Sequence, residues 1–388
     1  MKILVAAERL GRAGGMERYL EIVLPELVAR GASVHVLARD AEALPRGVTS
    51  QRVAWADEHD APGTVARAAV HDALASFAPD VAVAHNVMDA GIVEALRAAP
   101  RFAYHVHDHR PFCPNGDRVF PRSGRNCTQP LGRPCAVHSL TDGCAYGPRP
   151  RTLTLIRRRE RLRDAVAAAD AVIVASGYVA ARAAESGVEA GRIREIPLPL
   201  SPDAYAGRRV SGGDPRTILF AGRIVPQKGL DSLVRALAAI PPQRRPRLHA
   251  LGEGPELERA RELASACAVK LDAPGAVSAA AVRGALDEAA LVALPSRWAE
   301  PFGYVGIEAF ARGRPVAAYD VGGVRAWLDD GANGVLAPSG DEPALGEAID
   351  ALLHDDARRA RLSARARADA ERYRAAAIVD SLLTAYAG

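Results

Sequence analysis

The chain has 388 residues, which is too long for one hydrophobic core and suits two domains of roughly 150 to 200 residues each. Its composition, with 49% hydrophobic, 25% charged and 5% aromatic residues, excludes a disordered or fibrous protein. The formal net charge is only +4, from 50 Lys and Arg against 46 Asp and Glu, so no overall field favours a nucleic acid partner.

The N-terminal segment begins with an apolar stretch that is far too short for a signal peptide and that Glu8 interrupts. We interpret this stretch as a first buried strand. No apolar run long enough to cross a bilayer follows, because Arg, Asp or Glu repeatedly break the alanine-rich segments. The sequence therefore predicts a cytoplasmic protein with at most peripheral membrane contact.

In the first half, short apolar runs alternate with longer segments of helical spacing, which is typical of parallel sheets with helices on both faces. One such helix is predicted over Met16–Arg30. The predicted strands are Lys2–Ala6, Ser33–Ala38, Val81–His85, Phe102–His105 and Ala171–Ala175. We expect a doubly wound domain here.

The second half repeats this alternation after a Pro- and Gly-rich linker, Pro197–Asp203 and Gly207–Pro215. Helices are predicted over Leu230–Ala239 and Glu256–Ala266. The predicted strands are Thr217–Ala221, Arg247–Leu251, Leu291–Leu294, Pro315–Ala318 and Gly334–Leu336. Two Rossmann-like domains joined in this way are expected to turn the carboxyl ends of both sheets toward one interdomain cleft, where ligands of such folds bind.

Two cations follow the first strand of the second half. Arg223 and Lys228 lie in the segment from Phe220 to Gly229, between a buried strand and a helix. An Arg fork and a Lys point charge stabilise a diphosphate through charge-assisted hydrogen bonds. A solvated loop with two unrelated cations is the alternative for this segment taken alone.

Two carboxylates follow a later strand, with seven residues between them. Glu300 lies in a Gly-containing loop, where it can accept hydrogen bonds from sugar hydroxyls, and Glu308 lies about two turns along a helix, where it can accept from ribose hydroxyls. The backbone amides of Phe302, Gly303 and Tyr304 lie near that helix's N-terminus, which favours phosphate oxygens.

These residues resemble family 4 of the retaining GT-B glycosyltransferases, also called group 1 glycosyltransferases. The shared motifs are Gly-Arg-x5-Lys-Gly at 222–229, Leu-Gly-x-Gly-Pro at 251–255, Pro-Ser then Glu-Pro-Phe-Gly and Glu at 295–308, Val-Gly-Gly at 321–323, and Gly-Gly-Met-Glu at 14–17. The resemblance covers essentially the whole chain. It implies an N-terminal domain over 1–198 with an insert at 109–150, a nucleotide-sugar domain over 199–372, and a helix over 373–388 that returns to the N-terminal domain.

The resemblance also implies roles for single residues. Arg223 and Lys228 would bind the donor diphosphate, Glu300 the donor sugar and Glu308 the ribose. Gly15 would contact the phosphate region from the other domain. Gly252, with Gly254, would permit a tight turn near the nucleoside, although this pair alone is as much a structural signal as a functional one.

Three histidines, His105, His107 and His109, alternate at the end of an N-domain strand, so that period two puts them on one face. A lone histidine here is more often structural than catalytic. In similar enzymes a His, often followed by Asp, ends this strand beside the donor sugar. His107, followed by Asp108, is the best match and His105 the second choice.

The resemblance implies a hexosyltransferase-type enzyme that works with retention and without a metal. The acceptor would attack from the face that the diphosphate leaves, while Arg223 and Lys228 stabilise the leaving group. The acceptor is an unidentified hydroxyl of a glycan, a lipid or a small natural product. The alternatives are a GT-B phosphorylase or epimerase and, from another class, a catalytically silent nucleotide-sugar sensor or partner-binding subunit.

Four of the five cysteines lie within 32 residues of the insert: Cys113, Cys127, Cys135 and Cys144. In a cytosolic chain such a cluster indicates structural zinc more often than disulfides, but there is no Cys-x2-Cys pair. Zinc, disulfides and free thiols all stay open, and His105, His109 or His138 could replace one ligand. The insert could also shape the acceptor pocket.

An arginine-rich helix is predicted over Leu153–Ala169 directly after the insert. Its basic face could contact anionic lipid or an anionic acceptor. A solvated face, with Leu155, Ile156, Leu162 and Val166 packed inward, is the preferred interpretation.

Overall fold

The computed structural model describes residues 1–10, 14–41, 44–54, 64–147, 151–206 and 214–388. The chain forms two compact units. Unit 1 consists of Met1–Pro199 together with Ala375–Gly388, and unit 2 consists of Leu200–Arg374. Most of the predicted linker segment Gly207–Pro215 lies outside the described residues.

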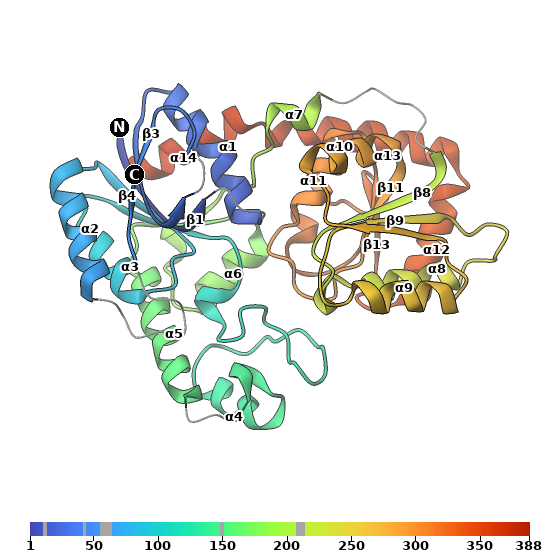
Figure 1. The fold of residues 1–388 in the computed structure, drawn as a ribbon, viewed down its shortest axis with the longest axis horizontal. Helices are drawn as coiled ribbons and strands as arrows, with labels where there is room; N and C mark the ends of the chain where they lie inside the picture. Colours follow the sequence, from blue (N-terminus) through green and yellow to red (C-terminus); the bar gives the residue numbers. More distant parts are fainter. Residues whose placement is uncertain (11–13, 42–43, 55–63, 148–150, 207–213) are drawn as a thin grey trace. The chain divides into compact units, whose positions relative to one another are not determined.

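Unit 1 is built on a seven-stranded sheet in the order β3-β2-β1-β4-β5-β6-β7, and all of its pairings are parallel (Figure 1). Its strands are β1 (Lys2–Leu10), β2 (Ser33–Ala41), β3 (Val48–Arg52), β4 (Val81–His85), β5 (Phe102–Val106), β6 (Ala171–Val174) and β7 (Ile193–Glu195). The strand order reverses direction between β1 and β4. This reversal point is where open α/β sheets bind ligands.

Unit 1 contains helices that pack on its sheet and one, α4, that lies in the projecting insert (Figure 1). They are α1 (Gly15–Ala29), α2 (Thr64–Phe77), α3 (Ala90–Leu96), α4 (Arg133–Thr141), α5 (Thr152–Ala167), α6 (Gly177–Glu185) and α14 (Ala375–Ala387), with short 3-10 turns η1 (Arg110–Phe112), η2 (Cys144–Tyr146) and η3 (Ala190–Arg192). The C-terminal helix α14 packs beside α1, where Arg30 pairs with Asp380. The end of the chain thereby completes unit 1.

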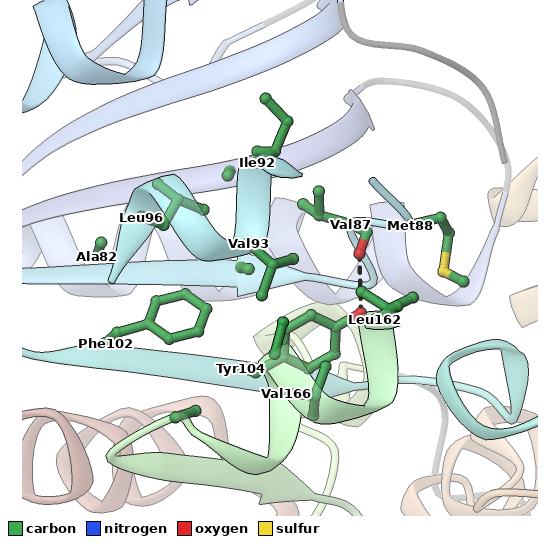
Figure 2. Packing of buried hydrophobic residues seen from close by; sticks show 14 of the residues in the cluster. Ala82, Val87, Met88, Ile92, Val93, Leu96, Phe102, Tyr104, Leu162 and Val166 are labelled. Atoms are coloured by element: carbon green, nitrogen blue, oxygen red, sulfur yellow. Dashed lines mark hydrogen bonds between the residues drawn. The ribbon is translucent and has the colours of Figure 1, made fainter. Parts of the chain in front are cut away.

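The core of unit 1 includes apolar side chains of β4, β5, α3 and α5 (Figure 2). Tyr104 of β5 is fully buried there, and its hydroxyl donates to the carbonyl oxygen of Val87 at 3.1 Å. This bond fixes the segment after β4 against β5. It therefore also fixes the polar residues at the ends of these two strands.

Unit 2 has a six-stranded parallel sheet in the order β10-β9-β8-β11-β12-β13. Its strands are β8 (Asp214–Ala221), β9 (Arg247–Leu251), β10 (Leu271–Gly275), β11 (Ala289–Leu294), β12 (Val316–Tyr319) and β13 (Gly334–Ala337). Its helices are α7 (Pro202–Tyr205), α8 (Leu230–Ala238), α9 (Leu257–Ala266), α10 (Ala279–Glu288), α11 (Tyr304–Ala311), α12 (Glu342–Leu353) and α13 (Asp356–Ala370), with 3-10 turns η4 (Pro226–Lys228), η5 (Gly322–Ala326) and η6 (Glu371–Tyr373). The order reverses between β8 and β11, as it does in Rossmann folds.

The predicted α/β class with two Rossmann-like domains is confirmed. Three strands escaped prediction: β3, β7 and β10. All three lie at sheet edges and are exposed along much of their length, so their sequences lack the apolar runs of buried strands. Within the described part of the chain, no helix combines the length and the apolar character that crossing a bilayer requires.

Candidate functional site

The reversal point of unit 2 gathers the charged motifs of the second half. Strands β8 and β11 are neighbours there, and a loop follows the carboxyl end of each. The loop after β8 carries Arg223 and Lys228, and the loop after β11 carries Ser296 and Glu300. Two segments about 70 residues apart in sequence therefore meet at one edge of the sheet.

An ion pair between half-buried Lys228 and buried Glu300 joins these two loops. Lys228 Nζ lies 2.5 Å from Glu300 Oε1, and Ser296 Oγ donates to the same oxygen at 2.5 Å. Glu300 is only 3% exposed. Burial by itself raises the pKa of this carboxyl, but the charge of Lys228 and the hydrogen bonds from Lys228 and Ser296 outweigh it, so the pKa is lowered. Glu300 is thus an ionised acceptor at neutral pH.

Glycines let the loops at this edge approach one another closely. Gly229 has φ +69°, and a Cβ on it would lie 2.1 Å from the carbonyl oxygen of Pro295. Gly252, at φ +142°, would place a Cβ 1.8 Å from the carbonyl oxygen of Gly222. No side chain fits in either place, because these contacts are with backbone atoms. The predicted turn at Gly252 is therefore also a backbone packing contact between the loops after β8 and β9.

Helix α11 (Tyr304–Ala311) begins four residues after Glu300. Gly303, at φ +106°, precedes its first residue Tyr304, and the carbonyl oxygen of Phe302 accepts from Trp327 Nε1 at 2.7 Å. This anchor fixes the helix's amino end, whose first amides lack intrahelical partners and favour anions. Glu308 lies one turn into α11 and is 8% exposed. The structure thus brings Lys228, Glu300 and the start of α11 to one edge of the sheet.

Arg223 differs from Lys228 in its surroundings. It is exposed at the carboxyl end of β8, and among the described residues it has no ion-pair partner. An exposed guanidinium beside the reversal point is available to an anion. That Arg223 binds the donor diphosphate stays a prediction.

Three histidines form a cluster at the carboxyl end of the unit 1 sheet. His107 Nε2 lies 3.0 Å from His85 Nδ1, and the backbone amide of His107 donates to Asn86 Oδ1 at 3.0 Å. His105 Nε2 lies 2.7 Å from the hydroxyl of Tyr386 in α14. One ligand atom from each of His85, His105 and His107 lies within 4.8 Å of the others, so within the described residues this is the group spaced to hold a metal ion.

The imidazoles of this cluster are neutral at neutral pH. Burial is the main reason why the pKa of His107 falls to about 4, with Asp108 raising it and Arg110 lowering it. Burial and the neighbouring imidazoles lower the pKa of His85 and His105 well below the usual range. A neutral imidazole both donates and accepts hydrogen bonds, which suits contact with sugar hydroxyls.

The expectation that His109 shares a face with His105 and His107 is wrong. Strand β5 ends at Val106, so the alternation of period two stops there, and His109 packs edge-on against Tyr178. Its place in the cluster is taken by His85 from β4. Sequence reasoning missed His85 and Asn86, although both stand at the end of a strand that neighbours β5.

Gly15 is exposed and is the first residue of α1. A Cβ on Gly15 would meet nothing within 4 Å, so local packing does not demand glycine at this position. The preceding residues 11–13 lie outside the described part of the chain. A role for Gly15 toward phosphate stays a prediction.

The four cysteines of the insert are half-buried free thiols. Burial raises the pKa of Cys113 to about 11; burial and the neighbouring Cys127, Cys113 and Cys135 raise that of Cys144 to about 12. Among the described residues these sulfur atoms do not form a group of three within 4.8 Å of one another. Of the alternative ligands, His105 bonds to Tyr386, His109 packs on Tyr178 and His138 pairs with Asp142.

Two family models match successive parts of the chain. Residues 13–204 match "Glycosyltransferase Family 4", and residues 205–369 match "Glycosyl transferases group 1". The chain belongs to the family 4, group 1 glycosyltransferases. This membership confirms the resemblance that the motifs indicated.

The curated relatives and solved structures agree with this family. The D-inositol 3-phosphate glycosyltransferase of Stackebrandtia nassauensis is 40% identical over 201 residues, covering 47% of this chain and 44% of the relative. The phosphatidyl-myo-inositol mannosyltransferase of Mycobacterium leprae is 33% identical over 197 residues, covering 50% and 52%. The matches thus span about half the length of these relatives.

The fold of this glycosyltransferase is GT-B, as predicted. The crystal structure of Anabaena HepE in complex with UDP has a TM-score of 0.72 to it, with 21% sequence identity and 99% of each chain covered. At this identity the likeness shows the fold alone.

Proposed function

We propose that this glycosyltransferase moves a sugar from a nucleoside diphosphate donor to a hydroxyl acceptor. The observation that carries the proposal is the hydrogen-bonded group of half-buried Lys228 and the buried residues Glu300 and Ser296 at the reversal point of unit 2. An ionised acceptor, a cation and a helix amino end at one sheet edge match the sugar and the diphosphate of such a donor. The UDP bound to the structural neighbour HepE is consistent with this donor class.

Each donor-site residue has a proposed role. Arg223 and Lys228 bind the diphosphate, together with the amides of Phe302, Gly303 and Tyr304. Glu300 accepts hydrogen bonds from the sugar hydroxyls. Glu308 accepts hydrogen bonds from the ribose hydroxyls, and its position one turn into α11 places it beyond the phosphate-binding amides. Gly15 and Gly252 leave room for the phosphates and the nucleoside.

The proposed reaction retains the configuration at the anomeric carbon. The acceptor oxygen forms a bond to that carbon on the face from which the diphosphate leaves, and the hydroxyl proton passes to the departing phosphate oxygen. Arg223 and Lys228 stabilise the charge that grows on this leaving group, a contribution that is larger in the transition state than in the ground state. These cations and amides neutralise the diphosphate, so the proposed mechanism uses no divalent metal.

His107 is the proposed contribution of unit 1. Its neutral ring can accept from, or donate to, a hydroxyl of the donor sugar, and the contacts with His85 and Asn86 hold the ring and its backbone in place. A neutral, fixed hydrogen-bonding group positions the sugar without adding a second cation. His107 therefore acts by positioning and polarity, and it is not a nucleophile.

The proposal is tested by following donor hydrolysis without an acceptor. A panel of UDP-, GDP- and ADP-hexoses is incubated with the protein, and the released sugar is examined by proton NMR before it mutarotates. We expect one donor to release nucleoside diphosphate and an α-sugar from an α-linked donor. Release of the β-sugar would contradict retention, and binding without turnover, with or without hydroxyl acceptors, would support the silent sugar-binding alternative.

A structural zinc ion in the insert is a separate proposal. It rests on four thiols within one short segment that has few buried apolar side chains. The present spacing of their sulfur atoms does not preform a zinc site, so binding would have to draw the thiols together. Zinc analysis by mass spectrometry on the purified protein and on a Cys127→Ser/Cys135→Ser variant decides it: about one zinc per chain, lost in the variant, supports the site.

A further inference from the structure

Positive charge is concentrated in one part of unit 1. Residues 109–163 contain twelve arginines and three acidic residues, which gives a net charge of +9. The whole chain carries +4, so all other residues together carry −5. The segment comprises the insert and most of α5, and in Figure 1 the insert around α4 projects from the sheet of unit 1 beside the start of α5. Unit 1 therefore contains one strongly basic segment, while the rest of the chain is slightly acidic.

Large apolar side chains are exposed on the same projection. Val137 is 57% exposed and Leu140 64% exposed in α4, and Leu153 is 56% exposed in the first turn of α5. Arg133, Val137 and Leu140 follow at spacings of four and three residues, so they share one face of α4. The opposite face of α4 carries the buried Ser139 and the half-buried Cys135. An isolated exposed leucine is ordinary, but three large apolar residues among arginines indicate a contact surface.

Four arginines of this segment are exposed, and in the described part of the chain their side chains have no ion pair and no hydrogen bond: Arg125, Arg133, Arg151 and Arg157. Arg122 is also exposed, but its guanidinium donates to the carbonyl oxygen of Thr141. Other arginines of the segment are engaged within unit 1. Arg161 binds Glu94 and Arg163 binds Asp164, whereas Arg159 is buried with its Nη1 3.8 Å from Met88 Sδ. The four exposed side chains thus make no ion pair that would stabilise the fold of unit 1.

We propose that α4 and the first turn of α5 bind an anionic lipid surface. Arginines bind lipid phosphates, while Val137, Leu140 and Leu153 bury their side chains among the upper acyl chains. The apolar residues argue against nucleic acid, because phosphate contacts alone need only the cations. This surface lies outside the proposed donor site, so the proposal is independent of the donor and its chemistry.

Vesicle co-sedimentation tests this surface with the full chain. Vesicles of phosphatidylcholine containing about 30 mol% phosphatidylglycerol are compared with pure phosphatidylcholine at about 0.1 M salt. We expect clear preference for the anionic vesicles and a fall in apparent affinity of about tenfold or more in Val137→Asp/Leu140→Asp. Arg133→Ala/Arg157→Ala should lower it by roughly fivefold per charge and flatten its salt dependence. Leu44→Asp, another exposed leucine of unit 1, is the matched control and should bind like the parent protein.

Two results would overturn the proposal. One is equal sedimentation with charged and uncharged vesicles, or with neither. The other is unchanged binding in Val137→Asp/Leu140→Asp, which would assign the lipid contact to another face. Selective retention on RNA or on a protein in place of vesicles would also contradict a lipid-binding surface. Donor hydrolysis is measured on each variant and should equal that of the parent, so a folding defect is separated from lost lipid binding.

Discussion

The carboxyl ends of the two sheets carry opposite kinds of chemistry. Unit 2 ends in charged groups, with Lys228 against an ionised, buried Glu300 and an exposed Arg223 nearby. Unit 1 ends in three imidazoles that stay neutral, of which His85 and His105 are buried and His107 is half-buried. The same doubly wound topology thus supports one edge suited to a diphosphate and one suited to uncharged hydroxyls. The topology therefore sets where each edge lies, whereas the residues that follow the strands set which chemical groups stand there.

Acidification should separate the two units most strongly. The pKa values of His85, His105 and His107 are lower in the folded chain, so their contribution to stability is complete above pH 6.5 and is lost as the pH falls below it. Each of the three steepens this loss, because the unfolded chain binds a proton there that the folded chain does not. Glu300, whose pKa is lowered, keeps its contribution down to about pH 4.5 and loses it below.

Hydrogen exchange followed by mass spectrometry at pH 7.5 to 5, corrected for intrinsic rates, measures this difference. We expect peptides of β4 and β5 to lose protection first. If the peptides of β8 and β11 lost protection at a higher pH than those of β4 and β5, or at the same pH, the histidines of unit 1 would not be the more acid-sensitive group.

Removing the cation of unit 2 should have the next largest effect. Lys228→Met deletes the charge that we propose to face the leaving diphosphate, and we expect turnover to fall by about 10²- to 10³-fold. Because the change also leaves Glu300 buried without its partner, the double variant Lys228→Met/Glu300→Gln is measured beside it.

Lys270→Met, at an exposed lysine of the same unit, is the control for Lys228→Met. Donor-hydrolysis rates decide the outcome. Near-parental turnover in the double variant would show that this pair is structural and has no part in catalysis.

The glycine contacts of unit 2 predict a stability effect. Gly252→Ala places a methyl group against the carbonyl oxygen of Gly222, and we expect it to lower the free energy of unfolding by about 2 to 3 kcal/mol. Gly284→Ala is the matched control, because a Cβ there meets nothing within 4 Å and the residue lies inside α10. It should stabilise unit 2 by about 0.5 to 1 kcal/mol. Calorimetric unfolding of both variants measures the two effects, and similar values for the two would refute the packing role.

The smallest effect should come from Glu308→Gln. The amide keeps the size of the side chain and weakens its hydrogen bonds to ribose hydroxyls, so we expect nucleotide affinity to fall about tenfold. Glu288→Gln, exposed in the same unit, should leave the affinity unchanged. Isothermal titration with the preferred nucleoside diphosphate measures both. Parental affinity in Glu308→Gln would remove Glu308 from the ribose site.

The sequence predicted the central strands of the two sheets better than the strands at their edges. Strand Val81–His85 was placed to the residue because it is an apolar run that follows Asp80 and ends at His85. Strand Arg247–Leu251 was placed to the residue because Pro246 and Gly252 bound it. The edge strands β3, β7 and β10 escaped because their pairing depends on a neighbouring strand more than on their own residues.

The charged side chains of the candidate site could be named from motifs, but their arrangement could not. Nothing in the sequence indicated that Lys228 and Glu300 pair directly, or that Trp327 anchors the start of α11. His85 was overlooked because it lies 22 residues before His107 and meets it only through parallel pairing of β4 and β5. The sequence likewise did not indicate that a Cβ at Gly252 would clash, because the clash is with a residue of another loop.

Hydrogen exchange with and without a nucleoside diphosphate measures whether the reversal point of unit 2 binds this ligand. We expect UDP, GDP or ADP to slow exchange in the peptides covering residues 222–229 and 295–308, and Lys228→Met to reduce this protection. Protection confined to other segments, or none with any of the three at millimolar concentration, would contradict a diphosphate site at the reversal point of unit 2.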